Sequence, residues 1–556
     1  MTLNRRAFIR QVGAGATGLG LLSFVPGCRT NRPAEGAGKF ARSTPEAEGV
    51  SSAGILAYLE AVRQSKPELH SLMVVRHGRV VAEGWWSPYG PEFNHTLYSL
   101  SKSFTSTAVG FAVADGKLRV DDRVVSFFPH DLPQPVSEHL AALRVKDLLT
   151  MSVGNAKEPT LPMVQTDNWV KTFLGWPIDH PPGTTFMYNS AATYMLSAIV
   201  QQVTGQKVID YLEPRLFTPL GIQGATWETC PRGINVGGWG LSVQTESLAK
   251  VGELYRQKGV WQGRQLLPAR WVEEATTFKI QQPPPAKPGR PNDQNDWLQG
   301  YCYQFWRCRH NAFRGDGAFG QYMIVMPEQD AVVAITAEVS DMQGELDLVW
   351  KHLLPAMKPQ PLPRDVHSQA ELRQTLASLA LTPPRGQHSS PVAGRISGKT
   401  FTLDPNDLGF RTRRISWTEV AGFTLDPNDL GFRTASFAFR NDGCLFTLRD
   451  SQAEYPIACG LERWRRGETA LPGTPPRLIS GGAPPSGTKS KVAASGTWKD
   501  PNTFEMVLRY YETPHHDTVT CHFDAEQVRI GFMNSMAQMS PTPKDKRPTL
   551  QGHMAI

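Results

Sequence analysis

The stretch from Tyr98 to Phe104 reads Tyr-Ser-Leu-Ser-Lys-Ser-Phe and places Lys102 three residues after Ser99. It opens a segment of helical character that runs to Ala114 and is followed by Asp115-Gly116, a pair typical of a helix end. Residues three apart on a helix share a face, so the lysine amine is expected within reach of the serine hydroxyl. The positive end of the helix dipole also helps to keep the lysine deprotonated. A serine with a base in hydrogen-bonding reach is a candidate nucleophile, so the stretch predicts nucleophilic catalysis.

The Ser-x-x-Lys spacing occurs three times in the chain, so spacing alone does not single out the first copy. Ser486 and Lys489 lie in a loop rich in Pro, Gly and Ser. Ser247 and Lys250 lie in a predicted helix without partner motifs, where a capping or surface role is expected. The motifs downstream of the first copy separate it from the other two.

Four further motifs follow the first Ser-x-x-Lys in sequence. They are Val145-Lys-Asp-Leu-Leu-Thr-Met-Ser-Val-Gly154, Pro182-Gly-Thr-Thr-Phe-Met-Tyr188-Asn-Ser190, Gly238-Trp-Gly-Leu-Ser and Gly317-Ala-Phe-Gly-Gln321. In this order, over about residues 45–355, the chain resembles the serine β-lactamase/penicillin-binding-protein superfamily. Its motifs are most similar to the class C-like branch, which holds the SxxK carboxylesterases and the 6-aminohexanoate-dimer hydrolases.

The resemblance implies an α/β (α+β) fold for residues 45–360, with two lobes, an antiparallel sheet and a helical lobe. The residues agree with this expectation. A β-hairpin is expected from Leu72 to Trp86 around His77-Gly78, and a second from Tyr322 to Ile335. Helical patterns such as Ala191 to Val203 lie between the two hairpins, as in a layered α/β domain.

Carried over residue by residue, the resemblance implies a serine hydrolase that works through an acyl-enzyme. Ser99 would be the acylated nucleophile and Lys102 its proton acceptor. Tyr188 would be a second proton relay, with its pKa lowered by the nearby lysine. The backbone N–H groups of Ser99 and Ala318 would form the oxyanion hole.

The same motifs suggest residues that contact the substrate, which is expected to be a small ester or amide. Ser190 is the polar residue that ends the tyrosine motif, and Gly317 and Phe319 flank the expected oxyanion donor. Trp297 or Tyr301, from the aromatic run before this strand, is expected to line the acyl pocket, although most of that run is expected in the core. The resemblance implies no metal ion and no organic cofactor.

One departure from the family pattern bears on the substrate. The chain has Asp316-Gly317-Ala318 where a β-lactamase carries Lys-Thr-Gly, so the cation that grips a β-lactam carboxylate is missing, although Arg314 is close in sequence. A β-lactamase or D,D-peptidase acting on β-lactam or peptidoglycan substrates therefore stays as an alternative. A third hypothesis is a catalytically idle envelope protein that uses the pocket only for binding.

Histidines and cysteines elsewhere carry weaker signals. His515-His516-Asp517 has the residue types of a metal site, but it has no third ligand at metal spacing and is expected to be a solvated strand end. Apart from Cys28 there are six cysteines, which an exported protein could pair in fifteen ways, so the sequence leaves disulfide pairing open.

Beyond the hydrolase domain, residues 361–395 are expected to be a linker and residues 396–556 a β-rich, barrel-like domain with alternating aromatic and polar residues. Within it, the twelve residues from Phe401 to Thr412 recur unchanged from Phe423 to Thr434. Two identical copies are too few for a repeat architecture and suggest a tandem duplication without a function of its own.

The first residues have the pattern of an export signal. The paired Arg5-Arg6 before Phe8 and a short apolar run resemble a twin-arginine signal, and Cys28 ends a lipobox-like segment as a lipidation candidate. Residues 1–28 are therefore expected to be the signal and 29–44 a tether, in a periplasmic or cell-envelope lipoprotein that contacts the membrane through its lipid. A net charge of +7 spread over 556 residues, without a basic patch interleaved with aromatics, argues against a nucleic-acid partner. The oligomeric state stays open.

Overall fold

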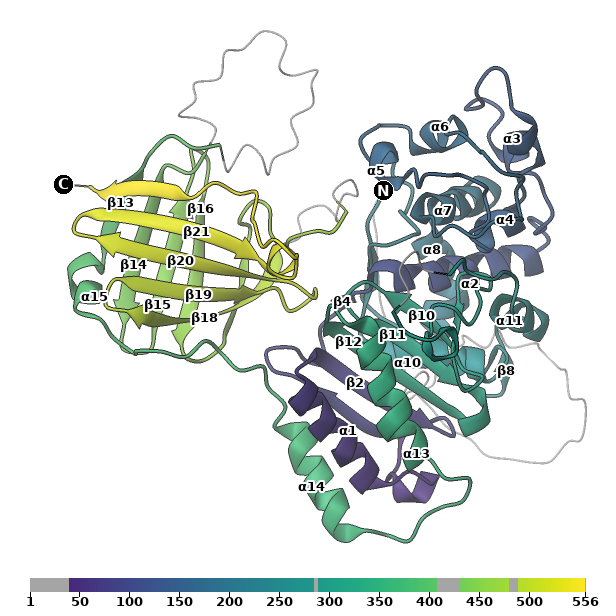
Figure 1. Cartoon of the computed structure of the whole chain (residues 1–556), viewed down its shortest axis with the longest axis horizontal. Coiled ribbons are helices and arrows are strands. Elements are labelled where there is room, and N and C mark those ends of the chain that lie inside the picture. The colour runs from purple at the N-terminus through teal and green to yellow at the C-terminus, as the bar shows by residue number, and fades with distance from the viewer. Residues whose placement is uncertain (1–39, 285–288, 408–430, 480–488, 556) are drawn as a thin grey trace, which may run out of the picture. The chain divides into compact units, whose positions relative to one another are not determined.

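The computed structural model describes residues 40–284, 289–407, 431–479 and 489–555, which are drawn in colour in Figure 1. The expected signal, Cys28 and most of the tether lie outside the described residues. So do residues 408–430, which hold much of the twelve-residue repeat, and residues 480–488 of the Pro-rich loop. Among the described residues, every helix is too short or too polar to span a bilayer.

The domain that the resemblance predicts to be a hydrolase, named the hydrolase domain from here on, is built on a seven-stranded sheet with the order β1-β3-β2-β12-β11-β10-β9. β1 pairs parallel to β3, and every other neighbouring pair in this sheet is antiparallel. The strand bounds are β1 Ala41–Arg42, β2 Glu68–Arg76, β3 Arg79–Trp85, β9 Trp306–Arg307, β10 Phe313–Gly317, β11 Gln321–Met326 and β12 Ala331–Glu338. The expected antiparallel sheet is confirmed.

Both faces of this sheet are covered, which explains why its central strands read as continuous apolar runs. On β2, Met73 and Val75 point into one buried cluster while Leu72 and Val74 point into another. The first cluster lies under α2 and α10, and the second under α1, α12 and α14. The bounds of these helices are α1 Ser52–Ser65, α2 Ser101–Ala114, α10 Thr245–Arg256, α12 Met342–Leu348 and α14 Val366–Ala377.

The two expected hairpins are both present. Arg76 pairs with Arg79 across a two-residue turn in which His77 and Gly78 have φ of 49° and 73°, left-handed values that suit a tight hairpin. β11 and β12 are joined through a 3₁₀ turn and by Asp330, also left-handed with φ of 52°.

The helical lobe packs around α7, Ser190–Thr204, which matches the expected helix from Ala191 to Val203. Its first turn is capped by Asn189, whose side chain accepts from the N–H of Ala192, and it ends at the left-handed Gly205. The other helices of this domain are α3 Glu138–Ala142, α4 Val145–Leu149, α5 Thr160–Met163, α6 Trp169–Leu174, α8 Val208–Leu212, α9 Thr218–Leu220, α11 Ala269–Thr276 and α13 Leu354–Ala356. Its short strands are β4 His95–Thr96, β5 Thr226–Trp227, β6 Leu241–Val243, β7 Val260–Trp261 and β8 Arg264–Gln265.

The range expected as a linker contains two helices, α14 and α15 (Pro391–Ile396). α14 lies beside α1 in both ribbon views. Its Leu372 is buried in the cluster under α1, and its Gln369 donates to the carboxylate of Glu46 at 2.6 Å. The first half of this range thus packs on the hydrolase domain.

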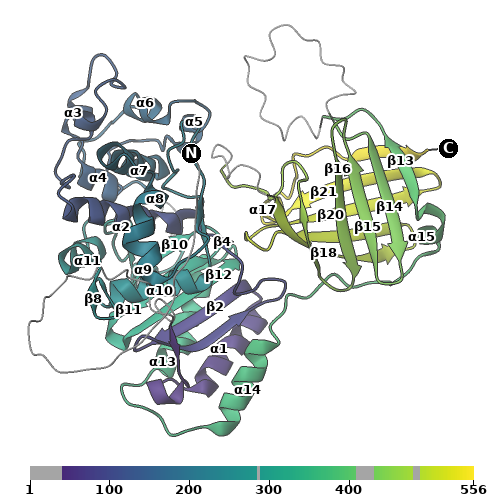
Figure 2. The ribbon, with the colours of Figure 1, turned by 180° about the vertical axis from the view of Figure 1, so that it is seen from behind.

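The C-terminal domain is a closed barrel of nine strands among the described residues, which confirms the β-rich expectation. The order is β16-β15-β14-β13-β22-β21-β20-β19-β18, and a parallel pairing of β16 with β18 closes it. Figure 1 shows its β18–β21 side and Figure 2 its β14–β16 side. The strands are β13 Lys399–Leu403, β14 Thr434–Arg440, β15 Gly443–Arg449, β16 Glu454–Leu461, β18 Ser490–Asp500, β19 Thr503–Arg509, β20 His516–Asp524, β21 Gln527–Asn534 and β22 Leu550–Met554. β17, Arg465–Thr469, pairs beside β18, and α17, Ser535–Gln538, follows β21.

The connection between β19 and β20 brings the barrel against the hydrolase domain. The N–H of Thr96 donates to the carbonyl of Glu512 at 2.9 Å, and the hydroxyl of Tyr89 donates to the carbonyl of Thr513 at 3.1 Å. This contact lies next to the strand that leads to Ser99.

The six cysteines within the described residues are buried and unpaired. Burial raises the pKa of the Cys302 and Cys444 thiols to about 12, so these groups are inert thiols at neutral pH.

Candidate active site

Ser99 lies in a single 3₁₀ turn, Tyr98–Leu100, directly ahead of α2. The hydroxyl of Ser101 fixes this turn, since it donates to the carbonyl of Tyr98 at 2.6 Å and accepts from the N–H of Leu241 at 3.1 Å. Tyr98 itself is left-handed, with φ of 48°. The side chain of Ser99 keeps partial exposure while its neighbours are buried, as a nucleophile must.

Lys102 is 2% exposed and reaches back to Ser99 from the first turn of α2. Its Nζ lies 3.2 Å from the Ser99 hydroxyl, 3.0 Å from the Ser190 hydroxyl and 2.7 Å from the carbonyl of Gly238. Burial of the amine lowers the pKa of Lys102 to about 7, against the smaller opposite effects of the Glu158 and Asp316 carboxylates. A neutral amine has one lone pair, which can accept a proton from a hydroxyl at this distance.

A glycine is required beside this amine. A Cβ on Gly238 would lie 2.8 Å from the carbonyl of Ser190 and 3.5 Å from Nζ of Lys102. The Gly-Trp-Gly-Leu-Ser motif therefore supplies an acceptor for the lysine from a backbone that only glycine can bring so close.

Tyr188 also lies beside Ser99 and Lys102. Its ring stacks on Trp306 with centroids 5.6 Å apart, and Nζ of Lys102 lies 4.9 Å from the ring centre. Burial and the Asp316 carboxylate raise the pKa of Tyr188 well above its usual value, and a hydrogen bond with Ser99 offsets only part of this. The expectation of a lowered pKa is wrong, because desolvation outweighs the lowering effects of the Ser99 hydrogen bond and of the Arg314 charge. The phenol is therefore protonated at neutral pH.

The end of β10 lies against the turn that carries Ser99. A Cβ on Gly317 would fall 1.9 Å from the carbonyl oxygen of Leu97, so no other residue fits there. Ala318 follows, and its carbonyl accepts from the side chain of Gln321 at 3.0 Å. Phe319 is left-handed, with φ of 68°, and packs edge-on to the Tyr98 ring at 5.6 Å.

Arg314 is not a free cation, although it stands close to the position of the missing lysine. It is fully buried and its guanidinium lies 2.9 Å from the carboxylate of Asp316. It also donates to the carbonyl of Asp296 at 2.8 Å, and its charge lies 4.4 Å from the centre of the Trp297 ring. The positive charge of Arg314 is therefore paired inside the protein.

The aromatic run forms a wall behind Tyr188. Tyr301 is 1% exposed and meets the Tyr188 ring edge-on at 6.4 Å, so it supports the tyrosine from inside the core. Trp297 is partly buried beside Trp306 at 6.4 Å. Trp306, the last residue of the aromatic run, is buried and is the ring that stacks on Tyr188.

Glu158 is a charged neighbour that the sequence did not reveal. Its carboxylate accepts from the N–H of Ser190 at 3.0 Å and from the N–H of Thr160 at 2.9 Å. It caps the start of α7 and acts on the charge of Lys102. No motif marks it, because its partner is thirty-two positions away in sequence.

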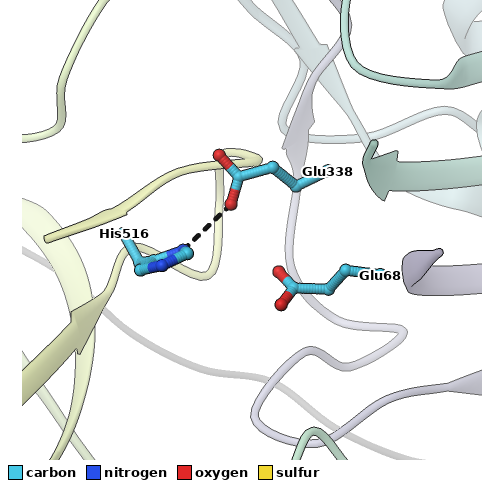
Figure 3. A group of neighbouring side chains, drawn as sticks. All are labelled: Glu68, Glu338 and His516. Carbon is cyan, nitrogen blue, oxygen red and sulfur yellow. Dashed lines mark hydrogen bonds and ion pairs between the residues drawn. The ribbon is translucent and has the colours of Figure 1, made fainter. Parts of the chain in front are cut away.

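The His515–Asp517 segment is not a solvated strand end. His515 is fully buried between Tyr98 and Glu338, and His516 donates to Glu338 at 2.9 Å. Figure 3 shows Glu68, Glu338 and His516 together; their ligand atoms lie within 4.8 Å of one another. The guanidinium of Arg509 already pairs with Glu68 at 2.5 and 3.1 Å, so a cation would face a positive charge there. Among the described residues this group is therefore an ion-pair cluster rather than a metal centre.

Comparisons with known proteins agree with the geometry. The family model described as Beta-lactamase matches residues 70–354. A 6-aminohexanoate-dimer hydrolase from Paenarthrobacter ureafaciens is 25% identical over 287 residues, which cover 47% of this chain and 71% of that protein. Penicillin-binding protein 4 from Amycolatopsis lactamdurans is 34% identical over 128 residues, 22% of this chain and 33% of that protein.

Among solved structures, the octameric penicillin-binding protein homologue from Pyrococcus abyssi has a TM-score of 0.44 and 15% identity, covering 90% of this chain and 99% of that one. The family model spans more than half of the chain and includes the Ser-x-x-Lys turn, the tyrosine motif and the strand of Gly317. The chain therefore belongs to the Beta-lactamase family, the serine hydrolases of the β-lactamase and penicillin-binding-protein superfamily.

Proposed function

We propose that this protein hydrolyses small esters or amides through an acyl-enzyme on Ser99. The observation that carries the proposal is the contact of Lys102 with Ser99, 3.2 Å from Nζ to the hydroxyl, made by an amine that is half neutral near pH 7. A base with a pKa close to the working pH is the most efficient proton acceptor.

In the first half-reaction the hydroxyl proton of Ser99 passes to Nζ of Lys102 as its oxygen attacks the carbonyl carbon. The tetrahedral oxyanion is stabilised by the N–H groups of Ser99 and Ala318. The phenol of Tyr188 gives its proton to the leaving group, whose bond to the carbonyl carbon breaks, and the ammonium of Lys102 returns a proton to the tyrosine. This order suits a tyrosine whose pKa is raised, since it starts each cycle protonated.

In the second half-reaction a water molecule replaces the leaving group. Lys102, neutral again, takes a proton from the water as its oxygen attacks the acyl carbon. The bond to Ser99 then breaks and the serine recovers its proton. Ser190 and Gly238 accept from the amine throughout, at 3.0 and 2.7 Å, and hold its lone pair toward the serine.

The electrostatics around Ser99 favour substrates without a carboxylate at this point. Arg314 is neutralised by Asp316 at 2.9 Å, and Asp316 lies close enough to act on the charge of Lys102. A β-lactam carboxylate would therefore find no unpaired cation among the described residues of this strand. A β-lactamase or D,D-peptidase is thus the second candidate, and an idle binding protein the third.

The test compares three substrates: p-nitrophenyl butyrate, the linear 6-aminohexanoate dimer and nitrocefin. We expect turnover of the ester, and loss of it in Ser99→Ala but not in Ser247→Ala, which removes the serine of another Ser-x-x-Lys. Unchanged hydrolysis in Ser99→Ala would overturn the nucleophile. Nitrocefin turnover without ester turnover would favour the second candidate. If no substrate is turned over and a serine-reactive phosphonate forms no adduct on Ser99, the third candidate is favoured.

We also propose export through the twin-arginine pattern and lipidation at Cys28, on the sequence alone. Replacement of Arg5 and Arg6 by lysine is expected to retain the protein in the cytoplasm of a bacterial host. Cys28→Ala is expected to move it from the membrane to the soluble envelope fraction. Unchanged fractionation of both variants would contradict the proposal.

A further inference from the structure

Tyr98, the residue before Ser99, has a backbone conformation that its surroundings must stabilise. Tyr98 has φ of 48°, a region that a bulky residue occupies only when its surroundings impose it. Its side chain is 7% exposed, and its hydroxyl meets Nε2 of His515 at 2.5 Å. His515 belongs to the barrel, 417 positions away in sequence. The other domain therefore supplies this support.

The hydrogen bonds around His515 define which ring nitrogen carries the proton. Nδ1 lies 2.6 Å from Oε1 of Glu338, a carboxylate that can only accept when ionised. Burial by itself raises the pKa of Glu338. Hydrogen bonds from His515 and His516 outweigh this effect and hold the pKa at about 2. The proton is thus on Nδ1, and Nε2 accepts from the hydroxyl of Tyr98.

His515 also contacts the other side of the expected oxyanion hole. The Phe319 ring meets the imidazole edge-on with centroids 4.8 Å apart, and meets the Tyr98 ring at 5.6 Å. Phe319 directly follows Ala318, as Tyr98 directly precedes Ser99. One imidazole therefore touches the neighbours of both backbone N–H groups that are expected to bind the oxyanion.

We propose that His515 of the barrel is a positioning residue for catalysis. It holds Tyr98 and Phe319 and thereby sets the separation of the Ser99 and Ala318 N–H groups, while Glu338 fixes its tautomer. The described side-chain contacts of His515 reach Tyr98, Phe319, Glu338 and Ser535, and none of them reaches Ser99. The inference rests on the proposed function, because it gives the barrel a part in the same acyl transfer.

The alternative is that His515 only holds the two domains together, and His516 offers a matched control for it. His516 also donates to Glu338, at 2.9 Å, from the next position in the chain (Figure 3). The side chain of His516 donates to Glu338 and its backbone N–H donates to Ser535, and neither bond reaches Tyr98. A role in domain contact alone predicts similar effects from the two histidines.

The experiment measures kcat and KM for p-nitrophenyl butyrate, with unfolding temperature as a folding control, in the full-length chain. Variants are His515→Gln, His515→Asn, Tyr98→Phe and His516→Gln. The Gln amide can reach the position of Nε2 and bond Tyr98, whereas the shorter Asn reaches only the Nδ1 position. We expect His515→Asn and Tyr98→Phe to lower kcat about ten- to a hundredfold with little change in KM, since misplacement by about 1 Å costs up to about a hundredfold.

His515→Gln is expected to recover most of the lost kcat, and His516→Gln to stay within about twofold of the wild type. Tyr98→Phe/His515→Asn should be no slower than either single variant, because both break the same contact. Equal losses in the two histidine variants, no rescue by Gln, or losses that multiply in the double variant would overturn the inference. Ser99→Ala tests the proposed function separately: residual ester turnover in that variant would overturn the acyl-enzyme, whatever the histidine variants do.

Discussion

The barrel core and the region around Ser99 bury different kinds of side chain. The barrel interior is packed with aromatic rings, such as Phe437 against Phe446 at 5.2 Å and against Phe523 at 5.0 Å. Around Ser99 the hydrolase domain instead buries an amine, Lys102, and an ion pair, Arg314 with Asp316. Apolar packing stabilises a fold without directing it to one chemistry, whereas buried charges need specific partners and tune pKa values. We therefore expect substitutions of the aromatic rings in the barrel core to change mainly stability, and substitutions of the buried charges beside Ser99 to change mainly turnover.

The largest effect is expected at the buried amine. Lys102→Met removes the base and should lower kcat/KM for p-nitrophenyl butyrate by about a hundred- to ten-thousandfold, the range for a general base. Lys250→Met is the matched control, because it removes the lysine of another Ser-x-x-Lys. Its ion-pair partner Glu246 is not left unpaired, since Arg42 lies 2.7 Å from the same carboxylate. We expect Lys250→Met to retain at least about half of the activity. Equal losses in the two variants would remove the distinction between the motifs.

Substitutions in the barrel core are expected to lower stability while leaving turnover nearly unchanged. Phe437→Ala leaves a cavity among buried rings and should lower the free energy of unfolding by about 3–5 kcal/mol. Turnover per folded molecule should stay within about threefold. Leu445→Ala, on the neighbouring strand and 42% exposed, is the control, with an expected change within about 0.5 kcal/mol. Calorimetry and ester hydrolysis measure the two quantities; a thousandfold loss of turnover in the folded Phe437→Ala protein would contradict the separation.

A smaller loss of turnover is expected when the close contact between β10 and the turn of Ser99 is disturbed. Gly317→Ala forces a Cβ against the carbonyl of Leu97, 1.9 Å away, and should displace β10 from the nucleophile turn. We expect turnover to fall about a hundredfold. Gly467→Ala in β17 of the barrel meets nothing within 4 Å and should be neutral in both activity and unfolding temperature. Full activity of Gly317→Ala would show that the close approach has no catalytic role.

Local patterns were enough to predict much of the fold. The helix after Ser99, the hairpin at His77-Gly78 and the β-rich C-terminal domain follow from capping residues, turn residues and alternation, which act over a few positions. The position of Lys102 beside Ser99 was also expected from helical spacing, because the 3₁₀ turn of Ser99 runs directly into α2 and keeps residues three apart on one side.

Contacts between distant segments could not be predicted in this way. Glu158 reaches Ser190, and His515 reaches Tyr98 from another domain, at separations for which a single sequence has no periodicity. The pKa of Tyr188 was expected to fall because Lys102 is near, but its direction depends on burial, which the sequence does not state. The same holds for Arg314, whose neutralisation by Asp316 requires both side chains to be buried together.

The most direct test of the central claim is the pH dependence of Ser99 labelling by a serine-reactive phosphonate. Attack on phosphorus needs the neutral form of Lys102, whose pKa is lowered to about 7 by burial. The labelling rate should therefore rise with pH, pass its midpoint near pH 7 and then level off, with the adduct on Ser99 in peptide mass spectra. An adduct on another residue, or a rate that climbs without a plateau toward the ordinary lysine pKa of 10.5, would contradict the account.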